Sequence, residues 1–421
     1  MRVTQKTKTL FILGGGFAGI RTAYLLSKKK LDLDITLVDR EPFHALSSTF
    51  YEVATAFIPW EKEAISTVLK GSASVPYEKI VDGTSIKFLQ GIVTNINSTE
   101  RSFSLADGSS GQADFLVLAL GSQIKNGSVP GTNRYAFSLH NLDQAMALRS
   151  HIVSLFLRYR TEFLAAQQKA FTFAVVGGGV NGVEFAAELA VLLKHLCFLH
   201  GVNHSVARII IFEETDTILR DLSPFLRANG IARLTKLGVE ICLKTKITSI
   251  GEDYIMANDE LRIPTMTVVW TGGVRANDVL LRSDLAINTI GGAVTSEHLE
   301  IGEGSNIFAA GDCTYFVDKA TSKVAPDVAW AALKQAEVVA ENIKRRIFGE
   351  TLMSYYVRQN PIFMTIGGKC GLVYFPPYQF SGFFAWILKQ LSELKYLWSI
   401  LPNGYAFLRW IKSIRVKIGN D

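Results

Sequence analysis

One supersecondary unit occurs twice in this chain, and it constrains the fold more than any other feature. The apolar run Thr9–Leu13 leads into GGGFAG, a helical stretch and a second apolar run that ends at Asp39. The run Phe171–Val176 leads into GGGVNG, another helical stretch and a run that ends at Glu213. A strand, a glycine turn, a helix and a second strand form a βαβ unit with a parallel sheet. The repeat predicts an α/β protein with two Rossmann-like dinucleotide-binding domains.

The first glycine turn predicts a dinucleotide site. Gly14, Gly16 and Gly19 form the pattern GxGxxG directly after a strand and directly before a helix. Such glycines permit a tight turn, close approach of a pyrophosphate and close packing of the helix on the sheet. The pyrophosphate then lies at the helix N-terminus, where free N–H groups and the helix dipole favour an anion. Asp39 ends the next strand, where its carboxylate can accept hydrogen bonds from ribose hydroxyls.

The second glycine turn repeats the pattern with Gly177, Gly179 and Gly182, and Glu213 ends the strand that follows. An acid at this position repels the 2′-phosphate of NADP, so we expect NADH rather than NADPH. Glu184 lies near the start of the helix after this turn. Its carboxylate has two interpretations, a catalytic group or a solvated first-turn acid stabilised by the helix dipole.

A late segment points to FAD in the first site. IFAAGD, residues 307–312, follows a strand; its aspartate either accepts from the ribityl chain of FAD or is an ordinary turn residue. If sequence near residue 300 closes the first fold, the second unit is inserted within it. The expected division is an FAD-binding domain from 1–130 and 290–348, an NADH-binding domain from 131–289, and a C-terminal domain from 349–421.

The C-terminal region combines apolar, aromatic and basic residues. The segment 383–421 holds six basic and two acidic residues, so it carries +4 of the net charge of +6. Apolar residues follow helical spacing on both sides of a break at Pro402–Gly404, and Lys389 and Glu393 form an i,i+4 pair off the apolar stripe. The pattern predicts helices that lie on a membrane surface, with packing on the protein or in a homodimer interface as the alternative.

Other classes of function are disfavoured. The apolar stripes are too continuous for nucleic-acid binding, and no stretch is long enough to span a membrane. The cysteines form no CxxC or CxxxxC pair, so a dithiol relay and disulfide reductase chemistry are not expected. We expect four reduced thiols and no metal site.

The sequence resembles type II NADH:quinone oxidoreductases, also called alternative NADH dehydrogenases, within the flavoproteins that bind two dinucleotides. The resemblance rests on stretches across most of the chain: ILGGGFAGI, FHALSSTFYEVATAF, LVLALGS, VVGGGVNGVEFAAELA, DTILRDLSP, TVVWTGGVRAN and IFAAGD. It implies that FAD takes hydride from NADH and then reduces a membrane quinone, by a ping-pong mechanism without proton pumping. It also implies a peripheral protein on the cytoplasmic face of the membrane, docked through its C-terminal helices.

The same resemblance implies roles for individual residues. Those implied to bind FAD are Gly14, Gly16, Gly19, Asp39 and Asp312, and those implied to bind NADH are Gly177, Gly179, Gly182 and Glu213. Further residues expected to contact a cofactor are Phe17, Ala18, Arg40, Gly121, Gly273 and Gly311. Glu184 matches a family glutamate that couples the nicotinamide and quinone sites, and Lys369, in TIGGKCG, falls near a family lysine paired with that glutamate.

The expected acceptor pocket departs from the family pattern. The family motif AQxAxQ corresponds here to AWAALKQ, residues 329–335, so the expected pocket is formed by Trp330, Ala331, Lys334 and Gln335. Trp330 replaces the first glutamine, and a tryptophan can stack on a quinone or close the pocket against it. The alternatives are a sulfide:quinone oxidoreductase-like enzyme, a reductase with another acceptor, or a redox sensor that binds FAD and NADH with little turnover.

Overall fold

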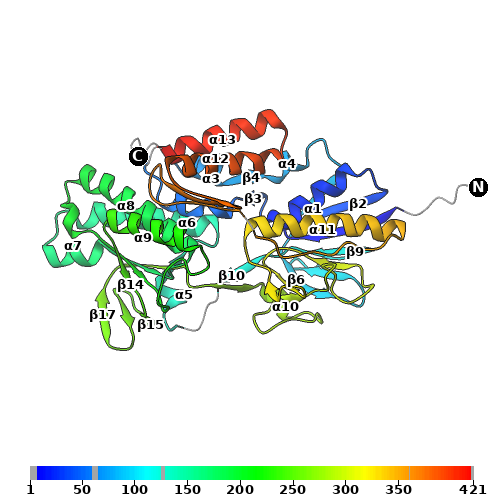
Figure 1. The fold of residues 1–421 in the computed structure, drawn as a ribbon, viewed down its shortest axis with the longest axis horizontal. Helices are drawn as coiled ribbons and strands as arrows, with labels where there is room; N and C mark the ends of the chain where they lie inside the picture. Colours follow the sequence, from blue (N-terminus) through cyan, green and yellow to red (C-terminus); the bar gives the residue numbers. More distant parts are fainter. Residues whose placement is uncertain (1–6, 59–64, 125–128, 360, 419–421) are drawn as a thin grey trace, which may run out of the picture.

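The computed structural model describes residues 7–58, 65–124, 129–359 and 361–418. Figure 1 shows two α/β lobes side by side, with the last two helices along one edge of the molecule. Each lobe is built on a five-stranded parallel sheet. The expected α/β fold with two Rossmann-like sheets is therefore confirmed.

The sheet of the first lobe contains a strand from late in the chain. In spatial order its strands are β21 (Ile307–Ala309), β9 (Phe115–Leu118), β1 (Lys8–Leu13), β2 (Leu33–Asp39) and β5 (Ile86–Gln90). β21 pairs with β9, and Ile307 lies opposite Leu116. Because the carboxyl ends of parallel strands share one edge, this pairing brings Asp312 to the edge that holds the first glycine turn.

In the sequence, all strands of the second lobe's sheet lie between β9 and β21 of the first lobe's sheet. Its strands are β11 (Ala136–Ser138), β18 (Thr267–Trp270), β12 (Thr172–Val176), β13 (Arg208–Phe212) and β14 (Val239–Cys242). All five residues of β12 are buried, as is typical of a parallel strand covered on both faces. The two lobes are also linked by an antiparallel pair, β10 (Ser122–Ile124) and β19 (Val274–Ala276).

Helices cover the sheets and start where local sequence favours it. In the first lobe α1 (Phe17–Lys28) packs against α11 (Ala329–Phe348). The second lobe carries α6 (Leu142–Tyr159), α7 (Leu164–Ala170), α8 (Val180–His200) and α9 (Pro224–Lys236). Asn141 and Ser223 cap α6 and α9 by accepting from the backbone N–H groups of Gln144 and Leu226.

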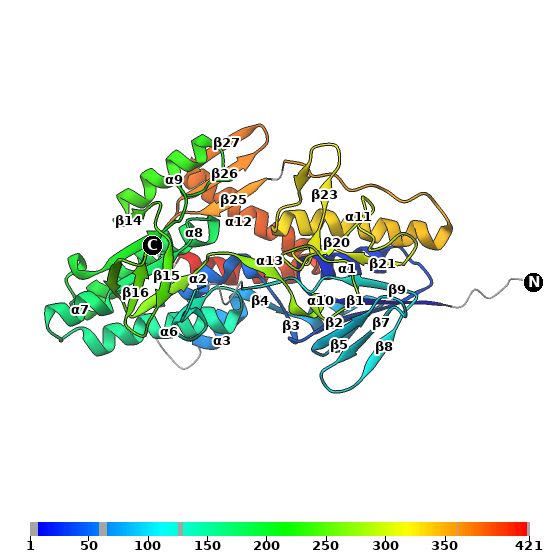
Figure 2. The ribbon, with the colours of Figure 1, turned by 90° about the horizontal axis from the view of Figure 1, so that it is seen from below.

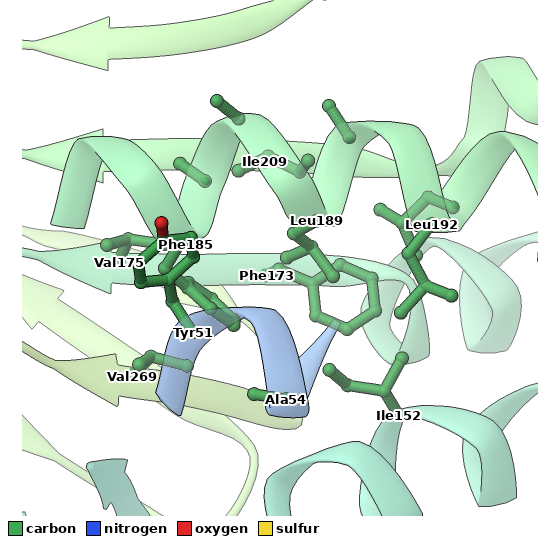
Figure 3. Close-up of a cluster of buried hydrophobic side chains, with 14 of the residues drawn as sticks. Tyr51, Ala54, Ile152, Phe173, Val175, Phe185, Leu189, Leu192, Ile209 and Val269 are labelled. Atoms are coloured by element: carbon green, nitrogen blue, oxygen red, sulfur yellow. The ribbon is translucent and has the colours of Figure 1, made fainter. Parts of the chain in front are cut away.

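The core of the second lobe includes a short helix from the first 60 residues. Figure 3 shows Tyr51 and Ala54 of α2 (Phe50–Ala54) packed among Phe173, Phe185 and Leu189. Every residue of α2 is buried. The helix α2, which follows the first glycine turn in the sequence, is thereby held in the hydrophobic core beneath the second glycine turn.

The C-terminal region forms a small sheet and a helical hairpin. β25 (Ile362–Thr365), β26 (Gly371–Phe375) and β27 (Tyr378–Gly382) pair antiparallel, and Figure 2 shows them between α9 and α12. α12 (Phe383–Trp398) and α13 (Asn403–Ile418) are separated at the expected break. Within the described ranges, the helices include none that is both long and apolar enough to cross a membrane.

The remaining elements are short. In the first lobe and its connections they are β3 (Phe43–Ala45), η1 (Ser47–Thr49), α3 (Ile65–Ala73), β4 (Ser74–Pro76), α4 (Tyr77–Val81), β6 (Val93–Asn97), β7 (Ser102–Leu105), β8 (Ser110–Gln112), α10 (Asp278–Leu281), β20 (Ala293–Val294), β22 (Thr314–Tyr315), β23 (Val317–Asp318) and β24 (Lys323–Val324). In the second lobe they are α5 (Thr132–Tyr135), η2 (His204–Val206), β15 (Ile247–Ile250), β16 (Tyr254–Ala257) and β17 (Leu261–Pro264).

Candidate functional site

At the first glycine turn, neighbouring backbone segments pack directly against Gly14 and Gly19, while the space beside Gly16 is open. A Cβ atom at Gly14 would lie 2.1 Å from the carbonyl oxygen of Ala119, and one at Gly19 would lie 1.8 Å from the carbonyl oxygen of Gly14. Gly14 also has φ +107, which side chains disfavour. A Cβ at Gly16 would meet nothing within 4 Å. The start of α1 therefore has the open cradle that a pyrophosphate needs.

Two acidic side chains line the first site, one at the end of β2 and one shortly after β21. The Asp39 carboxylate accepts from the N–H groups of Gly15 and Glu41 at 2.6 and 2.9 Å, and burial raises its pKa. Asp312 accepts from the Ser122 hydroxyl at 2.9 Å, and burial raises its pKa as well. Both carboxylates have oxygen lone pairs left for ribose or ribityl hydroxyls.

The other residues expected at this site lie around the same space. Phe17, Ala18, Arg40, Gly121 and Gly311 all line the cavity described below. Gly121 and Gly311 have φ +67 and +81, so both turns require a left-handed backbone. These contacts fit an extended dinucleotide that runs from the start of α1 to Asp312.

The second glycine turn has the same geometry. A Cβ at Gly182 would lie 2.1 Å from the carbonyl oxygen of Gly177, whereas one at Gly179 would meet nothing within 4 Å. Glu213 accepts from the N–H groups of Gly178 and Thr215 at 2.7 and 2.8 Å. Gly273 has φ +113 and open space where a side chain would be. The residues present therefore fit a second dinucleotide at the start of α8.

The surroundings of Glu213 favour NADH over NADPH at the second site. Arg208, the nearby cation in the sequence, forms a two-pronged ion pair with Glu240 at 2.8 Å. Its guanidinium group is thus already engaged, in an exposed pair at the start of β13 and at the end of that strand opposite to Glu213. An acid without this cation beside it disfavours a 2′-phosphate.

One cavity of about 2630 Å³ reaches both turns. It is lined by residues of the first turn, by Gly179 and Asn181 of the second, and by side chains of α11 and α12. Drug-sized ligands occupy pockets of roughly 300–1,000 Å³, so this space is large enough for two dinucleotides and a further molecule. Its walls come from both lobes and from the C-terminal hairpin.

Glu184 reaches this cavity from α8 as a buried group. Its side chain accepts from the backbone N–H of Thr365 at 3.0 Å, and the residue is 5% exposed. Burial raises its pKa to about 8, although the charge of Lys389 and the hydrogen bond from Thr365 act in the opposite direction. The interpretation as a solvated first-turn acid is therefore wrong, because the Glu184 side chain is buried against Thr365 of β25.

Lys389 of α12 acts electrostatically on Glu184. Lys389 is 5% exposed and pairs with Glu393 at 2.9 Å. Burial lowers its pKa, but the charges of Glu393, Glu52 and Glu184 outweigh burial and raise that pKa above its ordinary value. Lys389 lines the cavity, whereas Lys369 lies in the turn before β26, outside the residues that line it.

A cluster of buried charges surrounds Lys389. Lys417 of α13 contacts both Glu52 of α2, at 3.0 Å, and Glu393 of α12. Tyr51 donates to Glu52 at 3.3 Å and accepts from the Thr365 hydroxyl at 3.0 Å. The chain of contacts thus runs from Glu184 to α13. Sequence spacing identified Lys389 and Glu393 only as an i,i+4 pair off the apolar stripe, and the structure shields both of them from water together with Lys417.

The expected acceptor pocket is divided between two faces of α11. Trp330 and Lys334 line the cavity, and the Lys334 ammonium lies 5.3 Å from the centre of the Trp330 ring. Gln335 instead accepts from the N–H of Gly311 at 2.6 Å, beside the first site. Ala331 is buried in the helix packing and is not among the residues that line the cavity. Helical geometry separates these adjacent positions.

Comparison with known proteins agrees with this arrangement. The family model of pyridine nucleotide-disulphide oxidoreductases matches residues 8–336. The chain belongs to this family. Two full-length relatives are the type II NADH:quinone oxidoreductases of Staphylococcus epidermidis, 26% identical over 414 residues, and Staphylococcus aureus, 27% identical over 415 residues. Each alignment covers 96% of this chain and 99% of the relative.

Solved structures of other proteins share the fold of this chain. NDH2 from Plasmodium falciparum in complex with NADH has a TM-score of 0.83 at 16% identity, over 99% of each chain. Sulfide:quinone oxidoreductase from Aquifex aeolicus has a TM-score of 0.73 at 18% identity, over 93% of this chain and 91% of the other. At these identities the likeness concerns the fold, including the C-terminal region that the family model does not match.

Titration of Glu184 should make stability depend on pH. Its folded pKa of about 8 lies above the ordinary carboxyl value of 4.5, so the folded state holds a proton that the unfolded state releases. The contribution of this group to stability should therefore fall between about pH 5 and 8, by up to about 1.4 kcal/mol per pH unit. Chemical denaturation of the wild type and Glu184→Gln across this range measures the effect. A constant difference between the two curves would contradict it.

Removal of Lys417 should destabilise the fold strongly. Lys417→Met leaves the carboxylates of Glu52 and Glu393 buried with less neutralising charge, and broken buried pairs cost about 3–5 kcal/mol. Lys412→Met, an exposed change on the same helix, should alter the free energy of unfolding by less than about 0.5 kcal/mol. Urea denaturation compares the two variants. Equal effects would show that the buried cluster contributes nothing to stability.

Proposed function

We propose that this protein is an FAD-dependent oxidoreductase that takes hydride from NADH and reduces a membrane quinone without pumping protons. The observation that carries the proposal is the single cavity that reaches both glycine turns and α12. The names of the full-length staphylococcal relatives support the same reaction. We assign residues 1–130 and 290–348 to FAD binding, 131–289 to NADH binding and 349–421 to the C-terminal domain.

In this proposal each turn holds one pyrophosphate. The N–H groups at the start of α1, with Asp39 and Asp312, hold FAD, and those at the start of α8, with Glu213, hold NADH. When bound, FAD would accept hydride from NADH and pass two electrons to the acceptor. The packing of α2 against α8 joins the segment that follows the first turn to the helix that follows the second. We infer a ping-pong order, in which NAD leaves before the acceptor binds.

Glu184 and Lys389 are the proposed catalytic pair in place of Glu184 and Lys369. The raised pKa lets Glu184 hold a proton near neutral pH, at the wall of the cavity. Lys389 supplies a positive charge that stabilises the carboxylate after the proton has left. Reduction of a quinone to a quinol requires protons as well as electrons, so a buried acid at this wall suits the reaction.

The acceptor is proposed to bind between α11 and α12. Trp330 offers an aromatic face, and Lys334 offers a cation beside it, although Glu337 accepts from that ammonium at 2.8 Å. Trp330 also supports a second candidate function, a redox sensor with little turnover, because its ring can close the pocket. A sulfide-oxidising reaction has less support. Cys313 is fully buried, its thiol donates to the Leu118 carbonyl at 3.2 Å, and burial raises its pKa to about 11.

Flavin spectroscopy tests the reaction. Under anaerobic conditions NADH should bleach the flavin absorbance of the purified protein, and a water-soluble quinone should restore it. NADPH should react at least tenfold more slowly, since Glu213 disfavours its phosphate. Trp330→Gln separates the two candidates. If the wild type stays reduced with quinone and this variant turns over, the sensor is favoured. If NADH leaves the flavin oxidised, both proposals fail.

The C-terminal hairpin is proposed to dock on the cytoplasmic face of a membrane. Its outer face exposes large apolar side chains: Phe383, Phe384, Leu391, Trp398, Phe407 and Leu408. Lys395, Lys412 and Arg415 are exposed nearby and suit an anionic surface. The inner face packs on the protein through Leu394, Leu397 and Leu401. The remaining alternative for the outer face is a homodimer interface.

Vesicle binding tests this docking. The double substitution Phe407→Ser and Leu408→Ser should weaken binding to anionic vesicles at least tenfold, because each side chain contributes roughly 1.5–3 kcal/mol when it leaves water. Phe348→Ser, at an equally exposed position on α11, should bind as the wild type does. Co-sedimentation measures binding, and size-exclusion chromatography measures the oligomeric state. Unchanged vesicle binding together with loss of a dimer would favour the interface instead.

A further inference from the structure

Three side chains outside the glycine pattern form hydrogen-bond contacts that lead to the first turn. The carbonyl oxygen of Gly15 accepts from the Tyr77 hydroxyl at 2.8 Å and contacts Nδ1 of His44 at 2.9 Å. Nε2 of His44 lies 2.7 Å from the hydroxyl of Tyr396 on α12. Tyr77 and His44 are fully buried. A chain of hydrogen bonds therefore connects the C-terminal hairpin to the turn itself.

The protonation of His44 sets the direction of this chain. Burial lowers its pKa to about 4, so the ring is neutral at physiological pH. A neutral imidazole has one donor and one acceptor. Because the Gly15 carbonyl only accepts, Nδ1 carries the proton and Nε2 accepts from Tyr396. Phe17 contacts both rings, with centroid distances of 5.3 Å to His44 and 4.7 Å to Tyr396, and holds them in place.

The two donors to Gly15 decide where the next N–H group points. In a trans peptide the carbonyl of one residue and the N–H of the next point in opposite directions. With the Gly15 carbonyl held by Tyr77 and His44, the N–H of Gly16 faces the other way, at the open start of α1. Three consecutive glycines impose little conformational preference of their own, so the orientation of this peptide depends on the groups that bind its carbonyl.

The second turn is held differently. The carbonyl of Gly178, which corresponds to Gly15, accepts from the backbone N–H of Leu219 at 2.8 Å, within the second lobe. Its orientation thus depends on local backbone, whereas that of the first turn depends on α12. Other contacts join the hairpin to the same region, including those from Arg409 to the Ser74 carbonyl and from Arg21 to the Ser399 carbonyl.

We propose that Tyr396 and His44 are positioning residues that orient the Gly15–Gly16 peptide for the pyrophosphate of FAD, so that docking of α12 sets the affinity of the first site. The inference rests on the proposed function, because it takes FAD as the ligand of this site. It assigns to α12 a second role beside membrane docking. We expect its effect to be confined to FAD, since the Gly178 carbonyl of the second turn accepts from the backbone N–H of Leu219 and not from a side chain of the hairpin.

FAD titration of the full-length apoprotein tests the proposal. Tyr396→Phe removes one hydroxyl from a half-buried ring and should weaken FAD binding by about three- to tenfold, the effect of one lost hydrogen bond. Its affinity for NADH should stay within twofold of the wild type. Tyr405→Phe, the same change on α13, is the matched control and should leave both affinities unchanged. Quenching of flavin fluorescence and of protein fluorescence measures the two affinities.

A second variant separates positioning from folding. The side chain in His44→Asn retains a donor near Gly15 but is too short to reach Tyr396. The double variant His44→Asn with Tyr396→Phe should therefore bind FAD no more weakly than His44→Asn alone. Apoprotein melting temperatures should match for Tyr396→Phe and Tyr405→Phe, while the rise in melting temperature on adding FAD should shrink only in the former. Wild-type affinity in Tyr396→Phe, or equal loss for NADH, would overturn the inference. Failure of the wild type to bind FAD would instead overturn the proposed function.

Discussion

The contact of backbone with backbone at the two glycine turns is the constraint on which the rest of the structure depends. At Gly14, Gly19 and Gly182 a single Cβ atom would collide with a carbonyl oxygen of the neighbouring turn or strand. This approach brings the starts of α1 and α8 to the carboxyl ends of their sheets. Ligands of parallel sheets bind at that end. Because both lobes present this end to one cavity, two cofactors can meet within one chain.

Burial of charge at the junction of the lobes is the second determinant. Glu184, Glu52, Glu393, Lys389 and Lys417 come from α8, α2, α12 and α13, and each is largely shielded from water. Such groups are costly to bury singly, so they are stable only when all four helices are in place. The cluster therefore ties formation of the catalytic wall to docking of the C-terminal hairpin. The hydrogen bonds through His44 tie the first turn to the same hairpin.

Much of the site could be predicted from local sequence, and some of it could not. Asp39 and Glu213 could be placed because a βαβ unit fixes the distance from the glycine turn to the end of the next strand. The pattern GxGxxG did not identify Gly15 as a required glycine, although a Cβ atom there would collide with the Tyr77 hydroxyl. Lys389 was identified only as half of an i,i+4 pair off the apolar stripe, because that spacing describes one helix and says nothing of what covers it. Ala331 was assigned to the cavity although it faces away.

By itself, the sequence determined the two dinucleotide folds, the acid that ends each second strand and the amphipathic character of the tail. These features depend on interactions within about 30 residues, so periodicity and spacing record them. Only the tertiary structure decided that Glu184 is buried, that the charge of Lys389 acts on it, and that Tyr396 reaches His44. These outcomes depend on contacts between residues up to several hundred positions apart. Burial and electrostatic shifts arise from such contacts, and a local pattern carries no record of them.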